Sequence, residues 1–153
     1  MKQDAQTTLS DKDLKILKVL RENARATIRQ ISKRTGIRPS TVHQRLTKLI
    51  DSGAIKRFTI DIDEERLGIN LTVFMLVSGS LDKYLDKEII GDKHLVGISG
   101  VTGEYDLLLK MKFKNMSEFN DFIIRFRERY SANIQNTVTM VQTICLKDDG
   151  VRL

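Results

Sequence analysis

The polar side chains best suited to chemistry lie on one face of the segment that begins at Pro39. Counted in steps of about 100° per residue from Val42, they fall opposite the apolar positions or beside them: Ser40, Thr41, Gln44, Arg45, Thr47 and Lys48. Glutamine can read adenine and arginine can read guanine, whereas Thr41 and Lys48 suit phosphates or a thymine methyl group. Arg38 stands where a short capping side chain is usual, and it could contact a phosphate instead. This face predicts binding to double-stranded DNA; the alternative is a polar face that contacts only water.

Two short helices joined by a glycine-containing turn would position this face. Thr27 and Gln30 have the spacing of a capping box, and Gly36 suits the left-handed residue that ends the helix they begin. Ser10 and Asp13 repeat the capping spacing ahead of an earlier helix. Helices arranged around a turn of this kind are typical of a DNA-binding helix-turn-helix.

The apolar positions of these helices predict which side chains are buried. The first helix should bury three leucines and the third an apolar row: Leu14, Leu17 and Leu20, then Val42, Leu46, Leu49 and Ile50. Ile16 and Val19 widen the first row toward a possible partner surface. After the third helix, apolar and polar residues alternate from Ala54 to Ile62, which predicts an extended strand, and a short helix or turn ending at Gly68 follows.

The rest of the chain predicts a second, α+β domain. Strand patterns occupy residues 71–80, 94–98, 107–113 and 134–146, and helical spacing occupies 81–89 and 115–130. The last helix should bury Met116, Phe119, Ile123, Phe126 and Tyr130. The order βαββαβ is ferredoxin-like, and its two helices would leave the other face of the sheet bare for oligomerisation. We therefore expect a helix-turn-helix (winged-helix-like) domain at 1–53, a strand linker at 54–68 and a ferredoxin-like domain at 69–153.

A second candidate site is the turn Gly100-Val101-Thr102-Gly103-Glu104-Tyr105-Asp106. Its glycines would let backbone N–H groups approach a small carboxylate, and Asp106 could hold an ammonium group. An amino acid carries both of these charges. The alternative is an ordinary hairpin turn, which a Gly-x-x-Gly pattern usually marks.

Other reactive residues do not combine into a catalytic or metal site. His43 and His94 are far apart in the sequence and suit packing or surface roles better than metal binding. Cys145 is the only cysteine and has no paired base nearby in the sequence, so no disulfide within the chain and no nucleophile are expected. Glu104 and Asp106 share one strand face, which could suit a metal or an acid–base pair, but we interpret them as polar anchors. We expect no enzyme activity, no metal and no cofactor.

Charge and composition support a polyanion partner for the first part of the chain only. Residues 1–60 hold 14 Lys/Arg and 5 Asp/Glu, a net of +9, whereas residues 61–153 hold 12 and 15, a net of −3. The longest apolar run, residues 73–77, is far shorter than the ~20 residues that a membrane span needs. Residues 1–10 are polar, unlike a signal peptide. We expect a cytoplasmic protein with no membrane partner.

These motifs together resemble the Lrp/AsnC (leucine-responsive/asparagine regulator, feast/famine) family from about residue 9 to residue 147. The matching pieces are Leu9-Ser10-x-x-Asp13-x-x-Ile16-Leu17, Asn23-Ala24-Arg25, Pro39-Ser40-Thr41-Val42-x-x-Arg45-x-x-x-Leu49, Gly53-Ala54-Ile55-Lys56, Leu67-Gly68, Val101-Thr102-Gly103-Glu104-Tyr105-Asp106-Leu107-Leu108 and Thr137-x-Thr139. Arg38 departs from the serine usual before the proline.

The resemblance implies a transcriptional regulator that pairs as homodimers through the sheets, assembles to octamers, and responds to an amino acid or a related metabolite. The DNA-binding candidates are Arg38, Ser40, Thr41, Gln44, Arg45 and Lys48. The effector-binding candidates are Gly100, Val101, Thr102, Gly103, Tyr105, Asp106, Thr137 and Thr139. Two alternatives stay open: a sirohaem decarboxylase-like enzyme of the same architecture, and an effector-binding module without DNA affinity.

Overall fold

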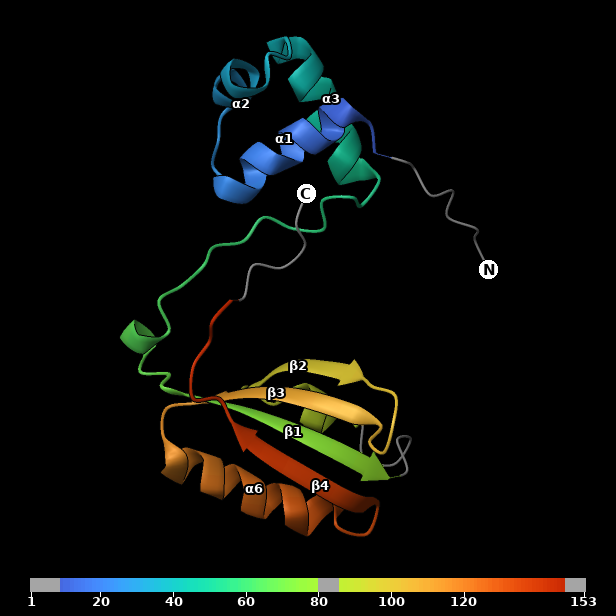
Figure 1. Cartoon of the computed structure of the whole chain (residues 1–153), viewed down its shortest axis with the longest axis vertical. Coiled ribbons are helices and arrows are strands. Elements are labelled where there is room, and N and C mark those ends of the chain that lie inside the picture. Colours follow the sequence, from blue (N-terminus) through green and yellow to red (C-terminus); the bar gives the residue numbers. More distant parts are fainter. Residues whose placement is uncertain (1–8, 80–85, 148–153) are drawn as a thin grey trace. The chain divides into compact units, whose positions relative to one another are not determined.

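The computed structural model describes residues 9–79 and 86–147. These residues form two compact units, one up to Ile62 and one from Asp63 onward. Each unit has its own hydrophobic core. Figure 1 shows helices α1 to α3 in the first unit and the sheet with α6 in the second.

The first unit consists of α1 (Asp11–Glu22), α2 (Ile28–Thr35) and α3 (Pro39–Asp51). Both predicted capping boxes are confirmed: Ser10 caps α1 with Asp13, and Thr27 caps α2 with Gln30. Gly36 ends α2 with a φ of +71°, in the left-handed region that glycine adopts without strain. Pro39 occupies the first turn of α3, where its missing N–H costs nothing. The predicted helix-turn-helix is therefore confirmed.

The core of this unit differs in part from the predicted one. Its buried side chains are Ile16, Val19, Leu20, Ile31, Ile37, Val42 and Leu49. Ile16 and Val19, which we assigned toward a partner surface, face α2 and α3, while Leu14 and Leu17 are only half-buried. Both rows repeat at helical spacing, so periodicity alone could not choose between them. Ile50, predicted buried, is 45% exposed.

The predicted strand from Ala54 to Ile62 carries no ladder in the described residues. Ile55 N–H donates to the carbonyl of Leu49 at 2.9 Å, and the chain then runs extended. Phe58, Ile60 and Ile62 are exposed by 52%, 72% and 48%. A strand needs a neighbour for its backbone groups, and none of the described residues pairs with this segment as a strand. The expected short helix after it is the 3₁₀ turn Glu65–Leu67, ended by Gly68.

The second unit has the predicted ferredoxin-like order. Its elements are β1 (Leu71–Gly79), α5 (Lys87–Ile90), β2 (Leu95–Gly100), β3 (Leu107–Phe113), α6 (Met116–Tyr130) and β4 (Ile134–Val141). They form an antiparallel four-stranded sheet in the order β2-β3-β1-β4. Leu81 and Leu85, predicted on a helix, lie outside the described residues.

Two strand boundaries were predicted wrongly. β2 runs from Leu95 to Gly100 rather than over 94–98. β4 ends at Val141 rather than at residue 146. Val141 pairs with Val73, close to the beginning of β1, so β1 offers almost no further residues for pairing. The pattern beyond Val141 is apolar enough for a strand, but no strand among residues 9–79 and 86–147 pairs with it.

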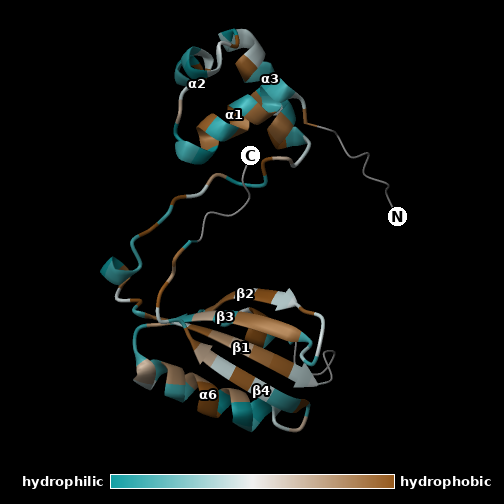
Figure 2. Cartoon of the chain, in the orientation of Figure 1, coloured by the Kyte–Doolittle hydropathy of each residue, from teal (hydrophilic) through white to brown (hydrophobic). Residues whose placement is uncertain are grey.

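The core of the second unit lies between the sheet and α6. β1 contributes Val73, Met75 and Val77, and β3 contributes Leu107, Leu109, Met111 and Phe113. Both strands are largely hydrophobic in colour in Figure 2. On α6 the buried residues are Phe119, Phe122, Phe126 and Tyr130. Phe122 was missing from the predicted row, and Met116, at the first turn, is 48% exposed instead of buried. Asn115 caps α6 by accepting from the N–H of Glu118.

The face of the sheet opposite α6 is apolar and lacks a cover among the described residues. Phe74 and Leu76 alternate with buried neighbours on β1 and therefore face this side. They pair with Met140 and Val138 on β4, which are 43% and 39% exposed. Lys110 lies over the ring of Phe74, 5.8 Å from its centroid. Helices on one face only leave this apolar side open, as predicted.

Candidate nucleic-acid interface and effector turn

Helix α3 presents its polar residues to solvent as the sequence predicts, with two exceptions. Arg38, Ser40, Gln44 and Lys48 are exposed, whereas Thr41 and Arg45 are half-buried. The cap residue Arg38 makes no side-chain capping bond, so its guanidinium is available to a ligand. The Thr47 hydroxyl donates to the carbonyl of His43 at 3.1 Å, which turns it back onto its own helix.

Arg45 is held by the beginning of α1. Its Nη1 donates to Ser10 Oγ at 2.7 Å and to Asp13 Oδ1 at 2.9 Å. Burial raises the pKa of the Asp13 carboxyl, but hydrogen bonds from Ser10 and Arg45 outweigh it and hold this pKa below its ordinary value of 3.8. The side chain of Arg45 therefore contacts α1 instead of pointing into the open face of α3. Asp13 and Arg45 are 32 positions apart, and nothing in the sequence indicated this contact.

Cations surround the first unit and give it the charge that a phosphate backbone attracts. Those whose residues are exposed on or beside its helices include Lys12, Lys15, Lys18, Arg21, Arg25, Arg29, Lys33, Arg38, Lys48, Lys56 and Arg57. Arg34 is exposed too, but it forms an ion pair with Glu22. The predicted basic half of the chain is thus a basic surface.

The turn after β2 is anchored to the end of β1 through Asp106. Asp106 N–H donates to the carbonyl of Val77, and Asp106 Oδ2 accepts from the N–H of Gly79, both at 2.9 Å. Val101 N–H donates to the carbonyl of Asp106 at 3.0 Å, which closes the turn. Gly103 has a φ of +120°, where a side chain would be strained. At least one oxygen of Asp106 is therefore used within the chain.

Thr137 and Thr139 lie on the other side of β1 from this turn. Val77 pairs with Leu107 on β3 and with Thr137 on β4, so the beginnings of β3 and β4 share one end of the sheet. Thr102 and Gly103 are exposed, and Val101 and Tyr105 are half-buried. Within one chain the two groups of predicted effector residues share this end of the sheet, separated by a strand.

His94 is a core residue that joins three elements. It is 5% exposed and its ring stacks on Phe113 with centroids 4.7 Å apart. Nδ1 lies 2.8 Å from Asp92 Oδ1 and Nε2 lies 3.0 Å from Glu118 Oε1. The hydrogen bond from the N–H of Lys114, and after it the hydrogen bond with His94, lowers the pKa of Glu118 from 4.5 to about 2. The expected packing role is confirmed, but sequence reasoning missed its two carboxylate partners.

The remaining candidate groups stay apart from one another. His43 is exposed on α3, Cys145 is exposed after β4, and Glu104 is exposed in the turn. Within the described ranges, 9–79 and 86–147, no group of three His, Cys, Asp or Glu could hold a metal ion. Over the same ranges, no helix is long and apolar enough to cross a membrane.

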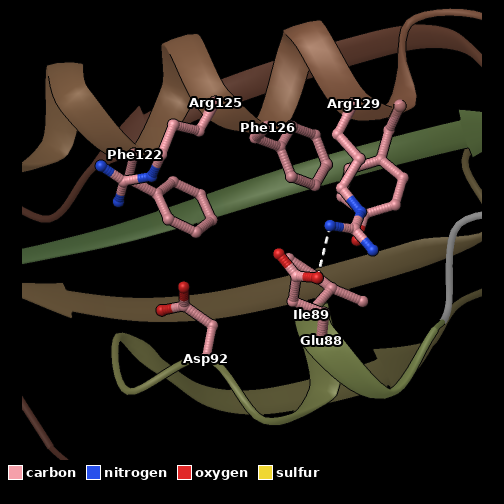
Figure 3. A pocket seen from close by; sticks show the side chains of 8 residues that line it. Glu88, Ile89, Asp92, Phe122, Arg125, Phe126 and Arg129 are labelled. Atoms are coloured by element: carbon pink, nitrogen blue, oxygen red, sulfur yellow. Dashed lines mark ion pairs between the residues drawn. The ribbon is translucent and has the colours of Figure 1, made fainter.

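A small hollow between α5 and α6 is closed by its own side chains. Figure 3 shows Phe122 and Phe126 facing Ile89, with Arg129 paired to Glu88 at one end. These apolar residues are only 3–5% exposed, so the hollow offers a ligand little apolar surface. Burial, and then the hydrogen bond to Asp86, raises the pKa of Tyr130 to about 12. We interpret this hollow as a packing gap between α5 and α6 and not as a ligand site.

Comparison with known families gives each unit of the fold its own family match. Residues 9–56 match a winged helix-turn-helix DNA-binding model, and residues 88–151 match the Lrp/AsnC ligand binding domain. The chain is 39% identical to the HTH-type transcriptional regulator FL11 of Pyrococcus horikoshii over 117 residues, which cover 75% of this chain and 78% of that protein. It is 36% identical to FL11 of Pyrococcus furiosus over the same share of each chain.

Solved structures repeat the whole architecture. A transcriptional regulator of Neisseria meningitidis in complex with L-methionine superimposes with a TM-score of 0.85 at 26% identity, covering 92% of this chain and 94% of that one. An AsnC family regulator from Agrobacterium tumefaciens has the same TM-score at 18% identity, covering 95% and 97%. At 18% identity, the likeness to the Agrobacterium tumefaciens regulator shows a shared fold alone.

Proposed function

The chain belongs to the Lrp/AsnC family of HTH-type transcriptional regulators, and we propose that α3 reads operator DNA while the second unit responds to an amino acid or a related small metabolite. The observation that carries this proposal is the exposed polar face of α3 on a capped helix-turn-helix with a basic surface. A helix presented in this way fits the major groove, where base pairs are distinguishable.

On α3 we assign different roles to the predicted residues. Gln44 and Ser40 are exposed and read base edges, and Thr41 contacts the backbone or a thymine methyl from its half-buried position. Lys48 and Arg38 contact phosphates, which position the helix without reading sequence. Arg45 fixes α3 to α1 through Asp13, so its part in recognition is to orient the other side chains.

We place the effector at the turn after β2. Support comes from the ligand-binding family match and from the Neisseria regulator, whose complex contains L-methionine. Backbone N–H groups around Gly100 and Gly103 would receive the carboxylate, because the space beside both glycines is open: a Cβ added at either one would have no atom within 4 Å. Asp106 would offer its remaining lone pairs to the ammonium group. Thr137 and Thr139 would complete the site from a neighbouring chain, because β1 separates them from the turn within one chain.

Homodimers would form through the open face of the sheet. An apolar side built from β1, β3 and β4 is a surface that soluble chains usually cover. Two such sheets packed face to face would bury Phe74 and Leu76, and further assembly to octamers would bring effector turns of different dimers together. An effector can shift this assembly only if it binds one assembly state, dimer or octamer, more tightly than the other.

The test is DNA binding by fluorescence anisotropy, comparing the DNA upstream of the gene with a scrambled duplex of equal length at about 50 and about 200 mM salt. We expect tighter binding to the upstream DNA at both salt concentrations, and a steep loss of binding to the scrambled duplex at the higher one. Addition of single amino acids, methionine first, should change the affinity or the oligomeric state. Equal binding to both duplexes at both salt concentrations would overturn the proposal.

A further inference from the structure

The chain enters the second unit through a turn that is closed by its own backbone. The unit begins at Asp63, and the 3₁₀ turn Glu65–Leu67 leads from there toward β1. The carbonyl of Glu64 accepts from the N–H groups of Leu67 and Ile69, both at 3.0 Å. Because these groups are paired with one another, the turn holds one backbone shape.

Strand β3 holds this turn at both of its ends. At the beginning of the turn, the carboxylate of Glu64 forms an ion pair with the Nζ of Lys112 on β3. After the turn, the N–H of Asn70 donates to the carbonyl of Phe113 at 3.1 Å. The backbone bond fixes where β1 starts, and the ion pair fixes the point at which the chain arrives from the first unit.

Lys112 is a firm place for such an anchor. It pairs with Thr72 on β1, and its N–H donates to the carbonyl of His94 at 2.8 Å on the other side. Its side chain is 20% exposed, and that of Glu64 is 42% exposed. The ion pair therefore joins the entering chain to a strand whose main chain is held from both sides.

We propose that Glu64 and Lys112 are positioning residues that determine which separation of operator half-sites the dimer accepts. The inference rests on the proposed function, in which two chains pair through their sheets and each presents one α3 to DNA. Each added base pair moves a half-site by ~3.4 Å and rotates it by ~35° about the DNA axis. Two recognition helices whose chains start from fixed points follow such a shift poorly, whereas loosened chains follow it more easily.

Two other roles suit this ion pair less well. As a source of stability alone it adds little, because backbone bonds already close the turn and ion pairs near the surface contribute little. As a contact to a second chain, Lys112 does lie on the open side of the sheet, since it alternates with buried Met111 and Phe113. Its ammonium group is already paired with Glu64 of its own chain, however.

The first experiment measures the accepted spacing with the full chain, by fluorescence anisotropy. The probes are the stretch of upstream DNA that the protein protects from nuclease, the same duplex with one or two base pairs inserted at its centre, and a scrambled duplex. We expect one inserted base pair to weaken binding of the parent chain ~10-fold or more. In Glu64→Gln and in Lys112→Gln this loss should shrink to ~3-fold or less.

Matched variants separate the anchor from general charge. Asp63→Asn and Arg66→Gln remove the same charges from an ion pair of 3.0 Å in the same turn, whose side chains are 56% and 85% exposed. They should keep the spacing preference of the parent. The reversed pair, Glu64→Lys with Lys112→Glu, should restore it.

Each outcome of this experiment is decisive. A parent chain that prefers upstream DNA but ignores the insertions, or variants of Glu64 and Lys112 that keep the parent's loss, would overturn the inference alone. An equal change in the variants of Asp63 and Arg66 would reduce the effect to net charge and overturn it too. A parent chain that binds the scrambled duplex equally would overturn the proposed function, and this inference with it.

A second measurement needs no DNA. A spin label at Asp51→Cys, in a Cys145→Ser background without another cysteine, reports the distance between the third helices of two paired chains. We expect Glu64→Gln to broaden this distance distribution and Asp63→Asn to leave it unchanged, with the oligomeric state from light scattering the same in both. Equal widths in the two variants would contradict the inference. Dissociation of Glu64→Gln would contradict it as well, because the ion pair would then support the dimer contact itself.

Discussion

The guanidinium of Arg45 lies 2.9 Å from Oδ1 of Asp13, joining the middle of α3 to the first turn of α1. Both side chains are partly shielded from water, with 32% and 15% of their surface exposed. Asp13 at the same time completes the capping box of Ser10. One carboxylate thus accepts from the N–H of the N-cap residue Ser10 and from the guanidinium of Arg45. The orientation of the recognition helix α3 therefore depends on the capping box of α1.

Removing either partner should loosen α3 as a whole. We expect Arg45→Ala and Asp13→Ala each to lower the thermal midpoint, with a coupling of ~0.5–3 kcal/mol in the double-mutant cycle. Affinity for operator and scrambled DNA should fall by similar factors, because every contact from α3 moves together. Calorimetry and anisotropy measure the two effects. A stable Arg45→Ala variant that loses preference for the operator alone would instead assign Arg45 to base reading.

Gln44 should show the opposite pattern. Its side chain is exposed on α3, so shortening it removes little buried surface. We expect Gln44→Ala to leave the thermal midpoint unchanged and to reduce discrimination between operator and scrambled DNA by ~1–3 kcal/mol. Anisotropy titrations with the two duplexes measure this difference. Unchanged discrimination would remove Gln44 from the reading face.

Local signals in the sequence predicted local structure well. The capping boxes of Ser10 and Thr27 and the left-handed Gly36 depend on residues within three positions of one another, and all were predicted correctly. The order of strands and helices in the second unit followed from periodicity in the same way.

Features that need a distant partner could not be predicted. Arg45 was assigned to guanine because nothing near it in the sequence indicates Asp13. The Ile16 and Val19 row was misjudged because two apolar rows on α1 have the same spacing, and only packing against α2 and α3 chooses one. The two carboxylates around His94 come from residues 92 and 118, which meet only when the sheet and α6 form.

Acid should weaken the second unit through Glu118. Its pKa falls from 4.5 to about 2 on folding, so it stabilises the folded chain fully above about pH 4.5 and loses that contribution as the pH falls toward 2. We expect Glu118→Gln to flatten this part of the stability profile, measured by denaturant unfolding at a series of pH values. Glu128→Gln, an exposed position on the same helix, is the control and should keep the slope of the parent.

Gly79 should tolerate no side chain. Its φ is +151°, and a Cβ there would collide with the carbonyl oxygen of Asn133. We expect Gly79→Ala to destabilise the second unit by ~1–3 kcal/mol and to disturb the bond from its N–H to Asp106, and with it the effector turn. Gly97→Ala is the matched control, because its Cβ would lie 3.6 Å from that of Lys110, an ordinary contact. Equal unfolding midpoints for the two variants would refute this account.

The open face of the sheet should decide the oligomeric state. Leu76 lies on the central strand β1 and faces away from α6, opposite Val138 and Leu108 on its two neighbours. Leu76→Lys would place a charge in the middle of the proposed dimer contact, where burying it unpaired is costly. We expect light scattering on a sizing column to show a smaller species with its sheet intact by circular dichroism. Ile124→Lys on α6 is the control, since Ile124 is already 55% exposed on the helical face. The proposed dimer forms through the sheets and not through the helices. If the Ile124→Lys control dissociates as readily as Leu76→Lys, the dimer contact lies on α6 instead.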